Sequence, residues 1–256
     1  MRSSTKIKSA VGACAALIGL VIAVTANFPN VQAQPDHQSA TAAPTATPIE
    51  PAPGDPAEAA SYAEAAVEAA ALPVIIDDPN APVPQYQRDS FGTAWSDIDG
   101  NGCRQRDDVL ARDLVDVVLD DNGCTVLSGV LVNDPYTGGD IVFQHDRVAE
   151  PGNPGSQGVQ GEHIVSLKAA HVGGAWAWTD DRRLQFANDL DNVIAVDGIE
   201  NQSKQDAGPS DWLPATWYRC TYVLKYTQII DTWGLSVTVA DRDALVQNLT
   251  TCGAES

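Results

Sequence analysis

The sequence predicts an α+β domain whose centre is a pair of short strands followed by a helix. The apolar pair Ile164-Val165 comes directly after Glu162-His163, and a second apolar run spans 193–196. Runs rich in β-branched residues are typical of buried strands. A polar cluster at 200–206 comes next and fits a helix. Two strands and a following helix would bring the polar side chains of this stretch together.

Five polar residues on this unit are the candidate site residues: Glu162, His163, Asn192, Asn201 and Lys204. A carboxylate and an amide oxygen suit a hard divalent cation, which prefers oxygen ligands and keeps several waters. An imidazole beside such a metal can deprotonate a water for attack. A lysine supplies a cation for a phosphate. The set therefore predicts a metal-assisted site for a phosphate ester.

The N-terminus of the 256-residue chain predicts a secretory signal peptide at residues 1–33. A basic start precedes the apolar stretch Ser9 to Ala26, and small residues at 31–33 form a cleavage site. Lipidation at Cys14 and a retained membrane anchor are the alternatives. We expect a secreted protein with no stable membrane partner.

The charge of the chain argues against a nucleic-acid partner at first sight. Removal of residues 1–33, which hold three basic residues and no acids, lowers the formal net charge from −19 to −22. Such a surface repels nucleic acid at long range. The charge is uneven, however, because residues 34–100 hold eleven acids and one basic residue, whereas 161–230 hold nine acids and six. A site in the second region can still accept a polyanion.

Four cysteines remain after the signal peptide: Cys103, Cys124, Cys220 and Cys252. An even number in an exported chain suggests two disulfide bonds. Three pairings are open, and we favour Cys103–Cys124 with Cys220–Cys252 because each pair brackets one local unit. A metal site made of these cysteines is disfavoured, since no two have CxxC spacing.

The rest of the chain is expected to form a linker and one domain. Residues 34–85 are rich in Pro and Ala and predict a linker. Within it, 57–72 favours a helix by its Ala and Glu content, which either docks on the domain or acts as a spacer. The domain is expected at 86–256, long enough to bury one core. We expect a monomer.

Local patterns predict the elements that flank the centre. The segments 124–131 and 140–143, separated by a turn at 134–139, predict a hairpin. Residues 150–160 predict a loop, and 108–119 stay open between a short helix and irregular structure. Helices are expected from Thr179, at 216–233, and at 238–252, where Thr238 and Asp241 form a capping box. These elements make a disulfide-linked hairpin region and C-terminal helices around the core.

A second group of possible metal ligands lies at Asp97 to Gly102, with Asp108 at the twelfth position. The spacing resembles the beginning of a calcium loop, but the usual glutamate and a flanking helix pair are missing. We interpret this segment mainly as a turn before Cys103, with Ca²⁺ binding as the alternative.

The remaining histidines and two tryptophans have weaker assignments. His37 lies in the linker and is expected to be solvated, while His145 and His171 are secondary candidates for the site. Trp176 and Trp178 are expected to pack in the core, with stacking on bases as the alternative.

Between Glu162 and Pro214 the sequence resembles the HNH, or ββα-metal (His-Me finger), nucleases. It is most similar to the secreted bacterial proteins that share the C-terminal domain of GmrSD-type restriction endonucleases. The likeness inside this stretch is carried by Glu162-His163-Ile164-Val165, Trp178, Arg182, Phe186-Ala187-Asn188-Asp189, Asn192, Asn201 to Asp206 and Trp212-Leu213-Pro214. Outside it, the same group is resembled by Phe91-Gly92, Trp95, Cys103, Arg106 to Leu110 and Asp134 to Gly138.

The resemblance implies an exported endonuclease on a ββα-metal core, acting on DNA with RNA as an open alternative. His163 would be the general base, and Glu162 with Asn201 would hold one Mg²⁺ or Mn²⁺, with Ca²⁺ as a further alternative. Asn192 would orient the His163 loop or buttress the two strands, and Lys204 would contact the scissile or an adjacent phosphate. The metal would stabilise the charge on phosphorus and on the leaving 3′ oxygen.

Two positions depart from the family pattern. Glu162 stands where the family usually has Asp, and the extra methylene could slacken the metal site or select a larger ion. Ser166 stands where Pro is frequent, so the loop after His163 could be less rigid. The strong negative charge, Glu162 in place of Asp and the linker after the signal peptide support a rival hypothesis of a catalytically weak or inactive binding or envelope-associated protein. A secreted antibacterial effector is a third.

Overall fold

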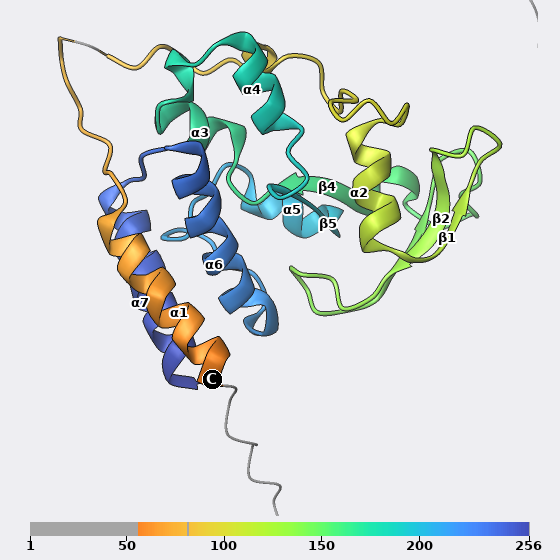
Figure 1. Ribbon diagram of the computed structural model, residues 1–256. Coiled ribbons are helices and arrows are strands. Elements are labelled where there is room, and N and C mark those ends of the chain that lie inside the picture. Colours follow the sequence, from red (N-terminus) through yellow and green to blue (C-terminus); the bar gives the residue numbers. More distant parts are fainter. Residues whose placement is uncertain (1–55, 81, 256) are drawn as a thin grey trace, which may run out of the picture. The chain divides into compact units, whose positions relative to one another are not determined.

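The computed structural model describes residues 56–80 and 82–255 (Figure 1). The expected signal peptide and the first part of the expected linker lie outside these residues, as does Cys14. Within the described residues, no helix is both long and apolar enough to cross a membrane.

The described chain has a mixed α+β fold with two small antiparallel sheets. The helices are α1 Pro56–Ala71, α2 Gln105–Asp113, α3 Leu167–Val172, α4 Asp180–Ala187, α5 Gly198–Lys204, α6 Thr216–Trp233 and α7 Val239–Glu255. The strands are β1 Val115–Leu119, β2 Val126–Leu131, β3 Ile141–Gln144, β4 Val159–His163 and β5 Val193–Asp197. Short 3₁₀ turns are η1 Arg88–Phe91, η2 Gly155–Gln157 and η3 Ala175–Ala177.

The central unit is the antiparallel pair β4–β5 with α5 directly after it (Figure 1). The carboxylate of Asp197 ends β5 and caps α5 by accepting the backbone N–H groups of Ile199 and Glu200. Two strands and a helix are thus present as predicted, but the first strand ends at His163. The apolar pair Ile164-Val165 is instead fully buried in the turn that leads to α3.

Side chains on the two faces of β5 belong to two different buried clusters. Val193 and Ala195 pack with α2 and the three-stranded sheet, whereas Ile194 and Val196 pack with the helical part of the molecule. Successive strand residues point to opposite faces, so a strand with both faces buried is apolar throughout. This burial holds the central unit firmly between two layers.

The three-stranded sheet has the order β1–β2–β3. The hairpin of β2 and β3 is confirmed, with Val130 paired to Val142. The open segment 108–119 divides into the end of α2 and the strand β1, which pairs with β2 through an irregular register. Most of β1 is exposed, so its sequence lacks the alternation of apolar and polar residues that marks a half-buried strand.

Helix α1 belongs to the packed domain and runs alongside α7 (Figure 1). Tyr62, Ala65, Ala69 and Leu72 are buried in the main core. Just beyond the helix, Val74 forms a parallel bridge with Val237. The packed unit therefore begins before Tyr86, the residue at which the sequence suggested that the domain starts. The alanines let the two helices approach closely. Because alanine occupies both the buried and the exposed face of α1, the sequence does not mark which face packs on the domain.

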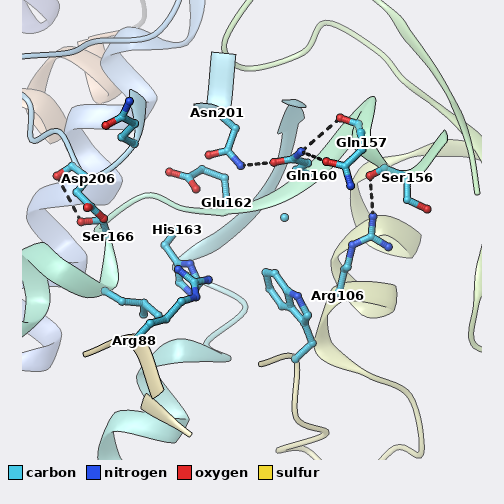
Figure 2. Close-up of a pocket in the computed structure, with 14 residues that line it drawn as sticks. Arg88, Arg106, Ser156, Gln157, Gln160, Glu162, His163, Ser166, Asn201 and Asp206 are labelled. Carbon is cyan, nitrogen blue, oxygen red and sulfur yellow. Dashed lines mark hydrogen bonds between the residues drawn. The ribbon is translucent and has the colours of Figure 1, made fainter. Parts of the chain in front are cut away.

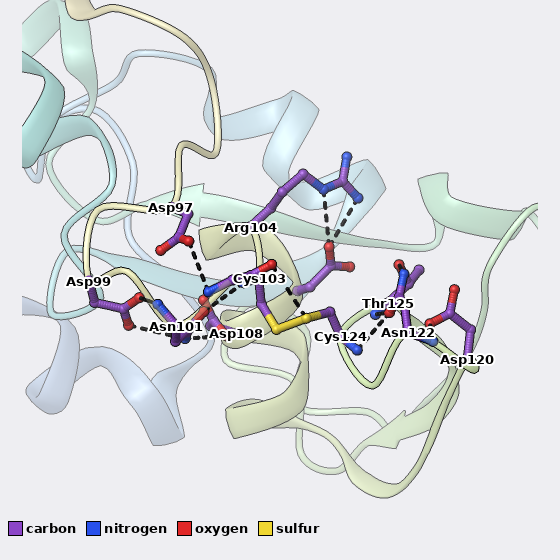
Figure 3. The surroundings of a disulfide bond; sticks show 12 residues. Asp97, Asp99, Asn101, Cys103, Arg104, Asp108, Asp120, Asn122, Cys124 and Thr125 are labelled. Carbon is purple, nitrogen blue, oxygen red and sulfur yellow. Dashed lines mark hydrogen bonds and ion pairs between the residues drawn. A yellow bond between two sulfur atoms is a disulfide. The ribbon is translucent and has the colours of Figure 1, made fainter.

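Both favoured disulfide bonds are present. Cys103–Cys124 joins the loop before α2 to the segment before β2, with 5.3 Å between the Cα atoms (Figure 3). Cys220–Cys252 joins α6 to α7, with 5.7 Å between the Cα atoms. The predicted helix starts are also confirmed, because the hydroxyl of Thr179 caps α4 and that of Thr238 accepts the N–H of Asp241 at the start of α7.

Candidate functional site

A pocket of about 640 Å³ opens over the end of β4 (Figure 2). Its walls come from η1, α2, η2, β4, the start of α3 and α5 with the residues that follow it. The lining residues are Arg88, Trp95, Arg106, Ser156, Gln157, Gln160, Gly161, Glu162, His163, Ser166, Leu167, Asn201, Gln205 and Asp206. Three of the five predicted site residues, Glu162, His163 and Asn201, are thus brought to one cavity.

His163 is the last residue of β4, and its ring is held in one orientation. Nε2 lies 2.8 Å from the backbone oxygen of Ala187. A carbonyl oxygen only accepts, so Nε2 carries the proton and Nδ1 keeps its lone pair. Within residues 56–80 and 82–255, Nδ1 has no hydrogen-bond partner. The residue is 7% exposed and lines the pocket, so its free nitrogen is suited to accept a proton from a bound water.

The surroundings of His163 keep its imidazole neutral. Burial lowers the pKa of His163 from its usual value of 6.5 to about 4, and the charges of Arg88 and Lys204 act in the same direction. Trp95 covers the ring, with the two ring planes inclined by 14° and the centroids 6.0 Å apart. A neutral histidine is the form that can act as a base at neutral pH.

Trp95 reaches this position through an unusual backbone. Its φ angle is 59°, a left-handed conformation that a bulky residue rarely adopts. The indole lies so close to Gly161 that a Cβ atom there would be 2.8 Å from it. Strained backbone of this kind concentrates at functional sites. The pair therefore explains both the glycine inside β4 and the cover over His163.

Glu162 is tied from behind to Lys204. The Nζ atom of Lys204 lies 2.6 Å from Oε1 of Glu162 and donates a second hydrogen bond to the backbone oxygen of His163 at 3.1 Å. Burial raises the pKa of Glu162, and the Lys204 charge opposes this shift. Lys204 is 0% exposed and does not line the pocket, so the predicted phosphate contact does not fit this geometry. Lys204 therefore holds Glu162 in position and favours its ionised form.

Asn201 on α5 reaches the same pocket from the other side. Its Nδ2 donates to Oε1 of Gln160 at 2.9 Å, which leaves the amide oxygen out of that bond (Figure 2). Gln160 and Glu162 point to the same face of β4. One carboxylate and one amide oxygen on this face form a donor set that fits a hard divalent cation. The described residues hold no cluster of three or more His, Cys, Asp or Glu that could bind a metal.

Asn192 and Ser166 fix the turn after His163. Asn192 is fully buried, accepts the N–H of Val165 at 2.9 Å and donates to its backbone oxygen at 3.2 Å. The hydroxyl of Ser166 caps α3 by accepting the N–H of Ala169 at 3.1 Å. Asn192 is therefore a positioning residue that does not line the pocket. The cap supplies local order at the position where the family often has proline.

Two arginines in the pocket were not among the predicted site residues. Arg88 comes from η1, and Arg106 comes from α2. The sequence offered two signals: Arg88 is the single basic residue between positions 34 and 100, and Arg106 begins a stretch that carries the family resemblance. Both arginines lie far in sequence from the central unit, so no local motif links them to it. Only the fold brings them to the pocket.

The secondary candidates lie away from the pocket walls. His171 is buried and its Nε2 lies 2.8 Å from the backbone oxygen of Pro84, while His145 contacts its own loop. Trp178 packs against Phe186 as expected for a core residue. The same expectation is wrong for Trp176, which is 40% exposed.

The acidic loop from Asp97 to Gly102 is a turn, as the main interpretation predicted. Asp97 accepts the N–H groups of Gly100 and Gly102 at 2.7 and 2.9 Å (Figure 3). The side-chain amide of Asn101 donates to Asp99 and to Asp108. The oxygens of this loop therefore hold the loop itself together.

Comparison with known proteins places the chain in a family. Residues 104–248 match the family described as GmrSD restriction endonucleases, C-terminal domain. An uncharacterized secreted protein of Arthroderma benhamiae is 37% identical over 177 residues, which cover 68% of this chain and 79% of the relative. No solved structure matches the chain. The chain therefore belongs to the family of GmrSD restriction endonuclease C-terminal domains, which points to a nuclease-related role. Membership of the HNH class and of a bacterial group stays a prediction.

Proposed function

We propose that this protein is a secreted, divalent-metal-dependent endonuclease of the HNH type that hydrolyses phosphodiester bonds. The observation that carries the proposal is the orientation of His163, whose Nε2–H is held by Ala187 so that Nδ1 keeps its lone pair, in a pocket that Glu162 and Asn201 also line. A buried, neutral imidazole next to oxygen ligands is the arrangement that metal-assisted hydrolysis needs.

His163 would accept a proton at Nδ1 from the water that attacks phosphorus. Trp95 and Ala187 keep the ring in place, and Asn192 with the Ser166 cap keeps the following turn in place. Lys204 favours the charged form of Glu162. Glu162 and Asn201 would hold one Mg²⁺ or Mn²⁺. When bound, such an ion neutralises charge on the phosphate and on the leaving oxygen.

The ββα-metal class and secretion belong to the same proposal. The order β4, β5, α5 and the family match support the class. The two disulfides and the secreted relative support an extracellular location, with the segment 1–33 as the expected signal peptide. DNA is the expected substrate and RNA the alternative, with the chain acting as a monomer.

A protein that binds without cleaving is the second candidate. It is favoured by the Glu162–Lys204 contact, which uses one carboxylate oxygen, and by the net charge of −19. In that case the pocket would hold its ligand without an attacking water.

The test is incubation of the mature chain with plasmid DNA or with structured RNA in Mg²⁺, Mn²⁺ or Ca²⁺, each with and without chelator. The His163→Ala variant is measured in parallel, and His145→Ala serves as the control because His145 lies outside the pocket walls. We expect chelator-sensitive cleavage by the native and control proteins and a loss of about 10²–10⁴-fold in His163→Ala.

The pattern of loss separates the two candidates. Cleavage that survives in His163→Ala would mean that the base is assigned wrongly. Folded native protein that cleaves neither polymer in any of the three metals would favour the binding protein.

A further inference from the structure

We propose that Arg88 and Arg106 form a phosphate anchor that holds a nucleic-acid strand on either side of the bond at His163. This inference rests on the proposed function and names the substrate class of the same pocket. The anchor selects a polymer with phosphates beyond the scissile one and disfavours a lone phosphodiester.

Arg88 supplies one side of the anchor. It begins η1, its side chain is exposed, and it lines the pocket next to His163 (Figure 2). It lines this pocket together with Glu162 and His163. Among residues 56–80 and 82–255, Arg88 forms no ion pair with a carboxylate.

Arg106 supplies the other side of the pocket (Figure 2). Its guanidinium is half-buried, with Nη2 near the backbone oxygens of Ser156 and Val159 at 3.3 and 3.4 Å and the group 6.0 Å from the Phe143 ring centroid. It also lacks an ion pair within the described part of the chain. Burial lowers the pKa of Arg106, and the negative charges of Asp107 and Asp146 oppose this shift, but neither carboxylate forms an ion pair with it. Its guanidinium can therefore still donate paired N–H groups to an anion from solution.

The pocket arginines differ in this respect from most arginines of the described chain. Carboxylate partners are present at Arg104, Arg112, Arg147, Arg183 and Arg242. Arg182 and Arg219 of the described chain also lack such a partner, but Arg88 and Arg106 are the two that line the pocket. A guanidinium offers paired N–H groups that match phosphate oxygens.

The position of the pair defines what can bind. Figure 2 places Arg88 beside His163 and Arg106 on the opposite side of the same pocket. A strand whose scissile phosphate lies at His163 would then offer a neighbouring phosphate to each arginine. A substrate with a single phosphate can satisfy only one position at a time. The anchor therefore favours internal cleavage of a polymer and offsets part of the repulsion from the acidic surface.

The first experiment compares two substrates of the mature chain in the metal that supports cleavage. Arg88→Gln, Arg106→Gln and the double variant are assayed on a short single-stranded oligonucleotide and on bis(p-nitrophenyl) phosphate. We expect kcat/KM for the oligonucleotide to fall at least about tenfold more than that for the single phosphodiester, mainly through KM. Arg242→Gln removes the same charge from α7 and is the control. Equal losses on both substrates would overturn the anchor.

The second experiment measures binding without chemistry. In the His163→Ala background with chelator, oligonucleotide affinity is measured against salt concentration. Each lost phosphate contact should lower the slope of log K against log salt by about 0.7, which Arg242→Gln should not do. If the parent protein cleaves nothing but the slope falls in the pocket variants, the hydrolysis proposal fails while the anchor is supported. Slopes equal to that of Arg242→Gln would refute the anchor.

Loss of fold is checked separately, because Arg106 is half-buried. If Arg106→Gln melts at a much lower temperature than the parent, Arg106→Lys is measured instead. Lysine keeps the charge but lacks paired donors, so the salt slope should stay while KM for the oligonucleotide rises. An unchanged KM in that variant would count against the anchor.

Discussion

Two parts of the molecule offer carboxylates and an asparagine at spacings that suit a cation, and they use these groups differently. One is the pocket at the end of β4, with Glu162 and Asn201. The other is the acidic loop from Asp97 to Gly102 that precedes α2. The loop has more acidic residues, yet the pocket is the better candidate for a metal.

The difference lies in what occupies the oxygen atoms. In the acidic loop, Asp97 accepts two backbone N–H groups, and Asn101 ties Asp99 to Asp108. In the pocket, Lys204 holds Glu162 from behind and Gln160 accepts the amide N–H of Asn201, while Glu162 and Asn201 both line the cavity. A cluster of acids that satisfies its own backbone is a turn, whereas oxygens supported from behind can face a ligand.

The largest effect is expected when the Lys204 ammonium that holds Glu162 is removed. Lys204→Met leaves a buried carboxylate without its cation and should lower the free energy of unfolding by about 3–5 kcal/mol. Urea denaturation measures the loss. The exposed pair Lys168–Asp206 is the control, since Lys168→Met should change stability by less than about 1 kcal/mol.

A double variant sharpens this result. Lys204→Met combined with Glu162→Gln removes both charges and should be more stable than Lys204→Met alone. If Lys204→Met is as harmless as Lys168→Met, the pair does not support Glu162 in the way we describe.

The pH dependence of stability tests whether His163 is held neutral. Its pKa is about 4 when folded and close to 6.5 when unfolded, so the unfolded chain binds more protons between these values. His163 therefore contributes stability above pH 6.5 that is lost as the pH falls toward 4, up to about 3 kcal/mol.

The comparison of native protein with His163→Gln isolates this contribution. Glu162, whose pKa is raised, changes stability in the opposite direction, but it is present in both proteins. Denaturation in chelator at several pH values should give a steeper acid loss for the native chain. Parallel curves would mean that His163 titrates normally.

Metal-induced stabilisation compares the two acid-rich parts directly. At about 100 times its Kd, a bound ion raises the free energy of unfolding by about 2.7 kcal/mol. Mn²⁺ should therefore raise the melting temperature of the native protein and of Asp97→Asn, but not of Glu162→Gln. If the effect is lost in Asp97→Asn alone, the metal binds in the acidic loop and not in the pocket.

Trp95 offers the smallest expected effect. Replacing it with Leu uncovers the His163 ring, so the pKa of His163 should rise from about 4 toward 6.5. NMR titration of the imidazole follows this change, and the acid limb of the activity profile should move the same way. An unchanged titration would mean that burial by other groups is sufficient.

Local chemistry made several elements predictable from the sequence. Thr179 and Thr238 carry hydroxyls at helix starts, and both cap the helices that follow. The hairpin follows from two β-branched runs around a turn. The cysteine pairs bracket short units, so their partners lie near in sequence.

Features that depend on tertiary packing were not predictable in this way. Ile164 lies in a buried turn, and the sequence pattern of a buried turn cannot be distinguished from that of a buried strand. The role of Lys204 is set by its burial behind Glu162, whereas a lysine in a polar cluster suggests exposure. Arg88 and Arg106 reach the pocket from segments far from β4 in sequence, so no local spacing marks them.

Chemical rescue tests the central claim, that Nδ1 of His163 accepts the proton in this pocket, most directly. Cleavage rates of the native chain and of His163→Ala are compared with and without added imidazole. The account predicts a loss of at least about 10²-fold that imidazole partly restores as its neutral form becomes available. A His163→Ala protein that cleaves as fast as the native chain would contradict it.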